Sequence, residues 1–491
     1  MRLEKGDPDM GFDKQMMHSQ RAYFEILEGH FGQAFRQMRG SKSDPDQAAA
    51  HMAQRPDFIN EWEKTKEVFL EDIQAFWDSN AEMVYTRIRE MKSLKLLFSG
   101  DISPSSSSNI AGSLGLYVDT IVLPDPMLRI GILFNLMPVS QQIRYLLRHV
   151  LNMMSYRDLA LADVAPPILV IAPDPNVLES NNQLFLSSMA ESDALFHFER
   201  LFERSFPTKR SLDTFLESIS TPEELVDELR RPDLLLFDVH WEEPLEAQIR
   251  RYQKGARKRF NIRISEEGFA KRIYPVALGR MLQVNDAIFK SMKYQATPFM
   301  NDPTLWQYLI WKYSYDAERL GQPEDEGHAW VMPVTLRVNG EMSLRLITGM
   351  PEDILIRMRK QDTMTDFRTV LREALHEIRE ADLSSVKETT RQAIVRIEKA
   401  FTTQEDFIHG IMSRNKQLFH GKIFPWVIPY KVSMTAAFER NVPLTMFNAS
   451  QGLKDLPAGK DLWKKGKALL KGAGALKRLP PALIFKQVQE I

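Results

Sequence analysis

The hydrophobic residues of the first hundred positions recur every three to four residues, which places them on common faces of helices. The first of two stripes consists of Phe24, Leu27, Phe31, Phe35 and Met38, and the second of Trp62, Phe69, Ile73 and Phe76. Amphipathic stripes of this width form the cores of helix bundles. We therefore predict that residues 1–98 are helical and that both stripes are buried.

The middle of the chain carries short apolar runs that are typical of buried strands. Residues 118–123 and 168–172 are rich in β-branched residues, and each run ends at the tripeptide Pro-Asp-Pro. Between them, residues 143–154 place apolar side chains at helical spacing, which gives a β-α-β order and predicts two parallel strands. A third run, "LLLFDVHW" at residues 234–241, predicts a further strand.

Helical spacing returns over residues 245–320 and again over residues 367–378. Between these segments, alternating residues around Asn339-Gly340 predict a hairpin of two antiparallel strands, because this dipeptide suits a tight turn. The predicted fold class is an α-rich multidomain α/β protein with a helical amino-terminal region, a small parallel α/β centre, and a carboxy-terminal hairpin plus helices.

A chain of 491 residues is too long for one ordinary hydrophobic core and predicts several packed units. We expect a helical region over residues 1–98 and an α/β central domain with a helical extension over residues 99–325. An α+β region with a basic amphipathic tail is expected over residues 326–491. Interruptions rich in serine, glycine or acidic residues, at 99–115 and 321–327, support these boundaries.

The composition restricts the chemistry open to the protein. The chain has no cysteine, which excludes disulfides, thiolate zinc sites, cysteine-ligated iron–sulfur clusters and a cysteine nucleophile. Its 64 basic and 65 acidic residues nearly cancel, so attraction to a polyanion must come from a local patch. Because no long apolar segment and no apolar leader is present, we expect a cytoplasmic protein without a transmembrane segment.

Four aspartates precede a proline at the start of an expected helix. They are Asp44, Asp125, Asp174 and Asp302. An aspartate at this position accepts hydrogen bonds from the free amides of the first turn, and proline is preorganised for helix entry. Because the dipeptide recurs with and without a preceding strand, we predict that these carboxylates cap helices rather than catalyse a reaction.

A metal site is the alternative for the acids near the predicted strands. Its candidate residues are Asp119, Asp174, Asp238 and His240, of which Asp119, Asp238 and His240 are also the catalytic candidates. Such a group of oxygen and imidazole ligands holds a divalent metal that activates water. The segment "YVDTIVL" is similar to the first strand of PIN-type nucleases over seven residues, and this resemblance implies a metal-dependent nuclease.

The segment 249–264 contains seven basic residues and no acid. They are Arg250, Arg251, Lys254, Arg257, Lys258, Arg259 and Arg263. On a helix several of them share a face that could follow a phosphate backbone, with aromatic neighbours for base stacking, so nucleic acid is one candidate partner. The alternative is a solvated face on a helix that Gly255 interrupts, paired with neighbouring acids such as Glu242, Glu243, Glu266 and Glu267.

The tail of the chain predicts a basic amphipathic helix. Its candidate contact residues are Trp463, Lys464, Lys467, Leu469, Leu470 and Lys471. Such a helix docks on the protein's own core, fits the groove of a protein partner, or lies on an anionic membrane surface. The dipeptide Pro480-Pro481 then ends the helix and predicts an extended segment through Phe485.

No nucleotide-binding loop or nucleophile motif is present in the sequence. We therefore favour a non-enzymatic binding or scaffolding component of a larger cytoplasmic assembly, with a protein partner and no cofactor. The general organisation resembles that of uncharacterised bacterial proteins, some of which belong to multicomponent antiviral defence systems. A metal-dependent nuclease, with a divalent metal as cofactor, and a nucleic-acid-binding protein remain the alternatives.

Overall fold

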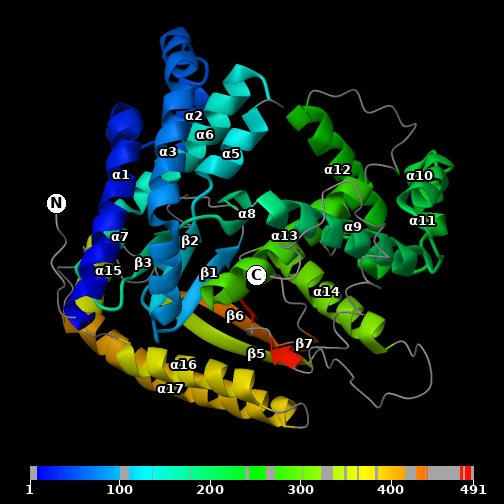
Figure 1. Ribbon diagram of the computed structural model, residues 1–491. Coiled ribbons are helices and arrows are strands. Elements are labelled where there is room, and N and C mark those ends of the chain that lie inside the picture. The colour runs from blue at the N-terminus through cyan, green and yellow to red at the C-terminus, as the bar shows by residue number, and fades with distance from the viewer. Residues whose placement is uncertain are drawn as a thin grey trace.

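The chain folds into an α-rich α/β protein in which helices surround one mixed sheet (Figure 1). The computed structural model describes residues 8–99, 110–134, 137–178, 180–237, 243–260, 270, 273–300, 302–321, 336–347, 351–361, 364–381, 385–414, 427–436, 438–440, 476–478 and 482–487. The predicted α-rich α/β class is thereby confirmed.

The amino-terminal region is helical as far as Glu90, as predicted, with α1 (Pro8–Ser41), α2 (Pro45–Met52) and α3 (Pro56–Glu90). Residues 95–98, also predicted to be helical, belong to strand β1 (Lys95–Ser99) instead. The two aromatic stripes meet between α1 and α3, where the rings of Phe31 and Phe69 pack edge to face with centroids 4.9 Å apart. Phe35 is half-buried and packs against this core, and the other stripe residues are buried. Helical periodicity alone therefore located this part of the core.

The sheet contains seven strands in the order β3-β2-β1-β4-β9-β6-β5. Their bounds are β1 Lys95–Ser99, β2 Thr120–Pro124, β3 Leu169–Ala172, β4 Thr297–Met300, β5 Leu336–Ile347, β6 Val427–Ala436 and β9 Ala482–Gln487. The first four and β9 are mutually parallel, whereas β6 and β5 run antiparallel to their neighbours. The parallel pairing of β2 with β3 confirms the predicted β-α-β order.

Short helices and one long helix connect the first strands. They are α4 (Ile110–Leu114), α5 (Met127–Leu133), α6 (Val139–Ser155), α7 (Arg157–Ala160) and α8 (Pro175–Leu178). The apolar stripe predicted within residues 143–154 is buried on α6. Gly115 follows α4 and leaves no room for a side chain, because an added Cβ would lie 2.6 Å from the carbonyl oxygen of Ala111.

The edge strand β3 is completed by a side chain. The amide group of Gln20 on α1 donates to the carbonyl of Ile171 at 2.9 Å and accepts from the Ile171 amide at 2.7 Å. A glutamine amide thus takes the place of a neighbouring strand. Because Gln20 is buried, these hydrogen bonds satisfy backbone groups that would otherwise be costly to bury.

A second hydrophobic core lies beside the sheet. It is formed by α9 (Ser180–Phe202), α10 (Lys209–Glu217), α11 (Pro222–Glu228), α12 (Leu245–Phe260), α13 (Ile273–Tyr294) and α14 (Pro303–Gly321). Two predictions fail here. Gly255 does not interrupt α12, and residues 234–237 form the end of a short 3₁₀ helix (Pro232–Leu234) and an irregular segment instead of a strand. The apolar side chains of Leu234, Leu235 and Phe237 pack in this second core.

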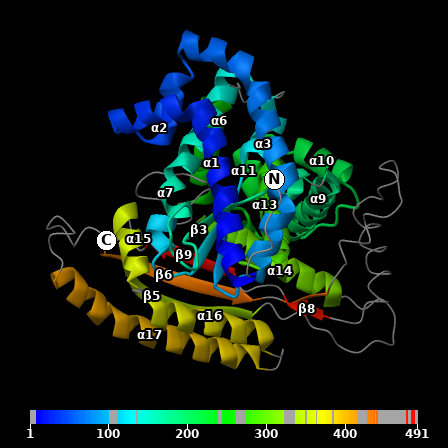
Figure 2. The same cartoon turned by 60° about the vertical axis from the view of Figure 1, so that its left-hand side comes forward.

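The described part of the carboxy-terminal region combines three helices with antiparallel strands. The helices are α15 (Glu352–Lys360), α16 (Thr365–Glu380) and α17 (Val386–Arg414), and the short strands β7 (Phe438–Arg440) and β8 (Leu476–Arg478) pair separately. Figures 1 and 2 both place α16 and α17 on the opposite side of the sheet from α1 and α3. None of the helices in the described segments combines the length and hydropathy needed to cross a membrane.

The hairpin predicted at Asn339-Gly340 is wrong. Strand β5 runs through this dipeptide, with a register shift between Val338 and Met342, and pairs with β6, which follows only after α15–α17. The asparagine-glycine pair therefore marks a β-bulge, which also uses glycine's freedom. The extended segment predicted before Phe485 is confirmed, since β9 inserts between β4 and β6.

Candidate functional site

The four aspartates that precede prolines all accept hydrogen bonds from the helices that follow them. The amide donors and distances are Gln47 to Asp44 at 2.9 Å, Met127 to Asp125 at 3.0 Å, Asn176 to Asp174 at 3.0 Å, and Thr304 to Asp302 at 2.8 Å. The predicted capping role is confirmed. Asp125 and Asp174 also contact side chains of other helices. Through these contacts the carboxyl ends of β2 and β3 are linked to α1, α3, α5 and α13.

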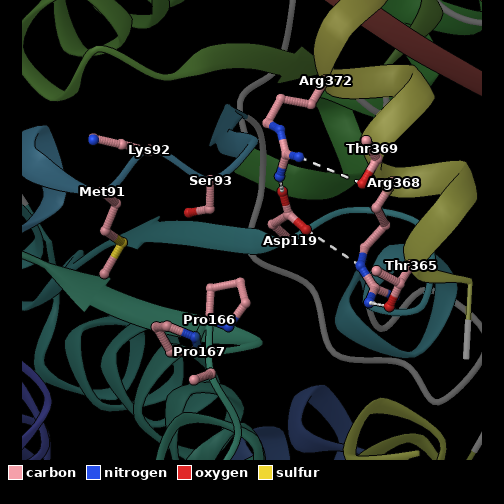
Figure 3. Close-up of a pocket in the computed structure, with 11 residues that line it drawn as sticks. Met91, Lys92, Ser93, Asp119, Pro166, Pro167, Thr365, Arg368, Thr369 and Arg372 are labelled. Carbon is pink, nitrogen blue, oxygen red and sulfur yellow. Dashed lines mark hydrogen bonds and ion pairs between the residues drawn. The ribbon is translucent and has the colours of Figure 1, made fainter. Parts of the chain in front are cut away.

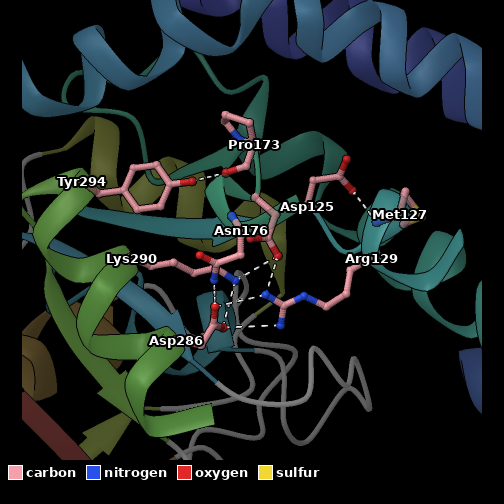
Figure 4. A network of polar contacts seen from close by, with 9 residues as sticks. Asp125, Met127, Arg129, Pro173, Asn176, Asp286, Lys290 and Tyr294 are labelled. Atoms are coloured by element: carbon pink, nitrogen blue, oxygen red, sulfur yellow. Dashed lines mark hydrogen bonds and ion pairs between the residues drawn. The ribbon is translucent and has the colours of Figure 1, made fainter. Parts of the chain in front are cut away.

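Asp125 is buried and fastens the amino-terminal helices to the sheet. Its carboxylate accepts from the Tyr23 hydroxyl on α1 at 2.8 Å and from the Trp77 indole on α3 at 2.6 Å. Burial raises the pKa of Asp125 to about 6, although the hydrogen bonds from Trp77, Met127 and Tyr23 oppose the rise. Figure 4 shows this carboxylate turned toward Met127 and away from Asp286.

Asp174 joins a partly buried cluster of four charges. It accepts from Lys290 Nζ at 3.0 Å and from Arg129 Nη2 at 2.8 Å. The same two cations hold Asp286, with Lys290 at 3.0 Å and Arg129 at 3.1 Å. Figure 4 shows Arg129 from α5 and Lys290 from α13 converging on Asp286. We call Arg129, Asp174, Asp286 and Lys290 the charge quartet, and its formal charges cancel.

A cavity of about 340 Å³ lies against the charge quartet, and we call it the carboxyl-edge cavity. Its wall includes Ser99 at the end of β1, Asp125 after β2, Asp174 after β3 and Leu305 near the start of α14 after β4. Strands β2 and β3 lie on one side of β1 in the sheet, and β4 lies on its other side. The strand order therefore reverses direction between β1 and β4, which makes this position a topological switch point. Ligands bind outside such points in parallel sheets.

The polar groups of the carboxyl-edge cavity differ in their access to it. Asp174 and Lys290 are buried, whereas the Arg129 side chain is 41% exposed and that of Asp286 is 17% exposed. The ring of Tyr145 on α6 also lines the cavity and packs edge to face with His149. A guanidinium, a carboxylate and an aromatic ring therefore meet at one cavity wall.

Asp119 directly precedes β2 and therefore lies at the amino ends of the parallel strands, opposite the carboxyl-edge cavity. Figure 3 shows Asp119 facing Arg368 and Arg372. Asp119 lies six residues before Asp125, a separation of about 20 Å at the usual rise per residue of a strand. Its carboxylate accepts from the Leu94 amide at 2.8 Å and pairs with Arg368 at 3.2 Å and Arg372 at 3.3 Å. The structure thus does not bring Asp119 together with Asp174.

The other sequence candidates fall partly outside the described residues. Asp238, His240 and Arg263 lie outside them. The candidate residues of the predicted tail helix, from Trp463 to Lys471, also lie outside them. In the basic segment, Arg250 pairs with Glu223 and Arg251 with Glu243. The side chains of Lys254, Arg257, Lys258 and Arg259 are outside the described set.

Three members of the charge quartet escaped sequence reasoning. Asp286 and Lys290 are four residues apart on α13, whose other inward positions are mostly apolar, and this spacing is the signal that could have drawn attention to them. Arg129 has no such signal, because its partners are 45 and 157 positions away. Within the described segments, no group of three or more histidine, aspartate or glutamate side chains is placed to hold a metal ion.

Known proteins provide no further guide to the site, since no family model, curated protein or solved structure matches this chain.

Proposed function

We propose that this protein is a non-catalytic binding protein whose carboxyl-edge cavity takes up a small uncharged ligand rich in hydroxyl groups, such as a sugar or a nucleoside. The observation that carries the proposal is the charge quartet, whose two cations pair with its two carboxylates. The quartet lines the carboxyl-edge cavity, and this cavity lies at the topological switch point. A cavity of about 340 Å³ is within the range that small ligands occupy.

Charge balance within the quartet supports an uncharged ligand. The third acid of the cavity wall, Asp125, is buried and already accepts hydrogen bonds from Tyr23, Trp77 and Met127. A charged group entering a partly desolvated cavity is costly unless an opposite charge is there to pair with it. Both cations of the quartet already pair with both of its carboxylates. A neighbouring pair of hydroxyl groups fits better, because one hydroxyl donates to Asp286 while the other accepts from Arg129. The Tyr145 ring offers a flat apolar face for a sugar or a base.

The hydrogen-bonding state of the acids supports binding rather than catalysis. Both oxygens of Asp125 and both oxygens of Asp174 accept hydrogen bonds or ion pairs from the protein itself. A general acid or base must exchange a proton with the substrate, and these contacts oppose that exchange. The nuclease alternative gains no support from the described residues, because Asp119 and Asp174 occupy opposite edges of the sheet.

Blocking the carboxyl-edge cavity should abolish ligand binding. Gln283 is an exposed residue of α13 that lines the cavity, so Gln283→Trp fills the entrance without disturbing the core. We expect the wild-type chain to bind adenosine or glucose, and Gln283→Trp to weaken that binding by about tenfold or more because a bulky ring displaces the ligand. Calorimetric titration with adenosine, glucose and the cationic glucosamine measures this effect.

The matched control is Leu282→Trp, which adds the same ring at the neighbouring exposed position outside the cavity wall. It should bind like the wild type. Preference for glucosamine over glucose would contradict the uncharged ligand. Failure of both adenosine and glucose to bind, or equal binding by Gln283→Trp, would contradict the proposed cavity.

The wider role that we propose is that of a component of a larger assembly. The basic amphipathic pattern of the tail supports a protein partner, and the basic segment 249–264 supports nucleic acid as a second candidate. The sequence-level resemblance to bacterial defence proteins supports placing this assembly in antiviral defence. A cytoplasmic location and peripheral contact of the tail with a membrane belong to the same proposal.

An assembly component should retain a protein partner at high ionic strength. We expect the tagged full-length chain, purified from its own cells in about 0.5 M salt, to carry a stoichiometric second protein, because apolar interfaces survive screening that removes ionic contacts. Size-exclusion chromatography with mass spectrometry measures this. A chain that elutes alone at low and high salt would contradict the assembly role without affecting the cavity.

A further inference from the structure

A second pocket, of about 650 Å³, opens at the amino ends of the parallel strands. We call it the amino-edge pocket. It lies around Asp119, between the segments that precede β1, β2 and β3 and the first two turns of α16 (Figure 3). It is separated from the carboxyl-edge cavity by the length of the strands, so it belongs to a different surface of the molecule.

The charges lining the amino-edge pocket do not balance. Asp119 supplies one negative charge, whereas Arg368, Arg372 and Lys92 supply three positive charges. Figure 3 shows the two arginines reaching Asp119 from α16, while Lys92 extends away from it. The pocket therefore differs from the charge quartet, in which cations and carboxylates are equal in number. An excess of positive charge favours an anionic ligand.

The two arginines are held differently. The Arg368 side chain is 5% exposed and is fixed by Asp119, by the carbonyl of Leu116 at 3.0 Å and by the Thr365 hydroxyl at 2.7 Å. The Arg372 side chain is 40% exposed, and its contacts to Asp119 at 3.3 Å and to the Thr369 hydroxyl at 3.4 Å are long. Arg372 is therefore able to turn its guanidinium toward a ligand, while Arg368 holds the local structure.

The residues of α16 that line the pocket lie on one face of this helix. Thr365, Arg368, Thr369 and Arg372 recur every three to four residues from the start of the helix at Thr365. The first turn also carries Asp366, which is not part of this lining. The pocket therefore meets the side of the helix, where Arg372 supplies a partly exposed guanidinium for an anion.

We propose that the amino-edge pocket binds the oxyanion group of an organic ligand, a phosphate ester or a carboxylate, through Arg372 of α16. The organic part of the ligand lies against Met91, Pro166 and Pro167, which face α16 across the pocket in Figure 3. The volume of the pocket is much larger than a bare phosphate requires. The ligand therefore combines an anionic group with an apolar body.

The test uses the full chain and three probes: inorganic phosphate, phenyl phosphate and benzoate. We expect phenyl phosphate to bind about tenfold more tightly than inorganic phosphate, because its ring buries apolar surface against the prolines. Arg372→Gln should weaken the binding of phenyl phosphate by about tenfold, the usual contribution of a hydrogen bond to a charged group. Binding is measured by calorimetric titration at constant ionic strength.

Arg144→Gln is the matched control, since it removes the same charge from an exposed arginine on α6 that pairs with Asp46. It should bind phenyl phosphate like the wild type, and all three proteins should unfold at similar urea concentrations. Tighter binding of phenyl phosphate than benzoate identifies a phosphate ester as the source of the oxyanion, and the reverse identifies a carboxylate. Absence of binding by both, or equal loss in Arg372→Gln and Arg144→Gln, would overturn the proposal.

Discussion

Replacing Lys290 with methionine should lower the free energy of unfolding by about 3–5 kcal/mol, since removing one partner of a buried ion pair leaves an uncompensated charge. The Lys290 side chain is 6% exposed and lies 3.0 Å from both Asp174 and Asp286. Methionine keeps the apolar stem but supplies no charge. The two carboxylates would then share Arg129 alone. Urea unfolding followed by tryptophan fluorescence measures the change.

The same variant should alter the response to acid. Burial by itself raises the pKa of Asp286, but the charges of Lys290 and Arg129 outweigh it and hold the pKa below the ordinary value of 3.8. A carboxyl with a depressed folded-state pKa adds stability above its unfolded-state pKa and loses it as pH falls through the folded-state value. The stability difference between wild type and Lys290→Met should therefore narrow below about pH 4.

Lys64→Met provides the control for Lys290→Met, because Lys64 is an exposed lysine of α3. Its effect should stay within about 0.5 kcal/mol, as is usual for surface substitutions. If the two methionine variants were equally stable, the charge quartet would not hold α13 against the ends of the strands. In that case Arg129 alone would suffice for both carboxylates.

Replacing Arg359 with methionine should also destabilise the protein, by about 3–5 kcal/mol. Arg359 is 2% exposed, and its guanidinium donates to four backbone carbonyls. The acceptors are those of Gly115 at 2.7 Å, Val118 at 2.9 Å, Asp119 at 2.9 Å and Pro166 at 3.1 Å. Each hydrogen bond to a charged group contributes about 1.5–3 kcal/mol, and the four are not independent because they share one side chain.

Arg357→Met is the matched control on the same helix. Arg357 is 49% exposed and pairs with Asp353, a contact that contributes about 1 kcal/mol or less. Arg359→Lys should recover only part of the stability, since an ammonium group has three donors and lacks the planar fork of arginine. If Arg357→Met and Arg359→Met unfolded at equal urea concentrations, the hydrogen bonds from Arg359 to the four backbone carbonyls would not be needed to attach α15 to the segments before β2 and β3.

The strands that sequence reasoning missed illustrate a general limit. Strand β1 follows directly on α3, and β4 has four residues and includes Pro298, which cannot donate a hydrogen bond. Neither carries turn signals or alternation that would identify a strand by itself. They are strands because their neighbours in space supply the hydrogen bonds. Residues 234–237 show the reverse error. Their apolar sequence predicts a strand, but the side chains pack in the core formed by α9 to α14.

The sequence by itself determined the local structure of this protein. Helical stripes, the apolar strands β2 and β3, and the capping aspartates are legible because their physical causes act within a few residues. Only the tertiary structure decided which edge of the sheet each aspartate occupies, which cations meet Asp174 and Asp286, and what Arg359 holds. Apart from the Asp286–Lys290 pair within α13, these contacts join residues 45 to 244 positions apart. Contacts over such separations depend on the order of the strands and the packing of the helices.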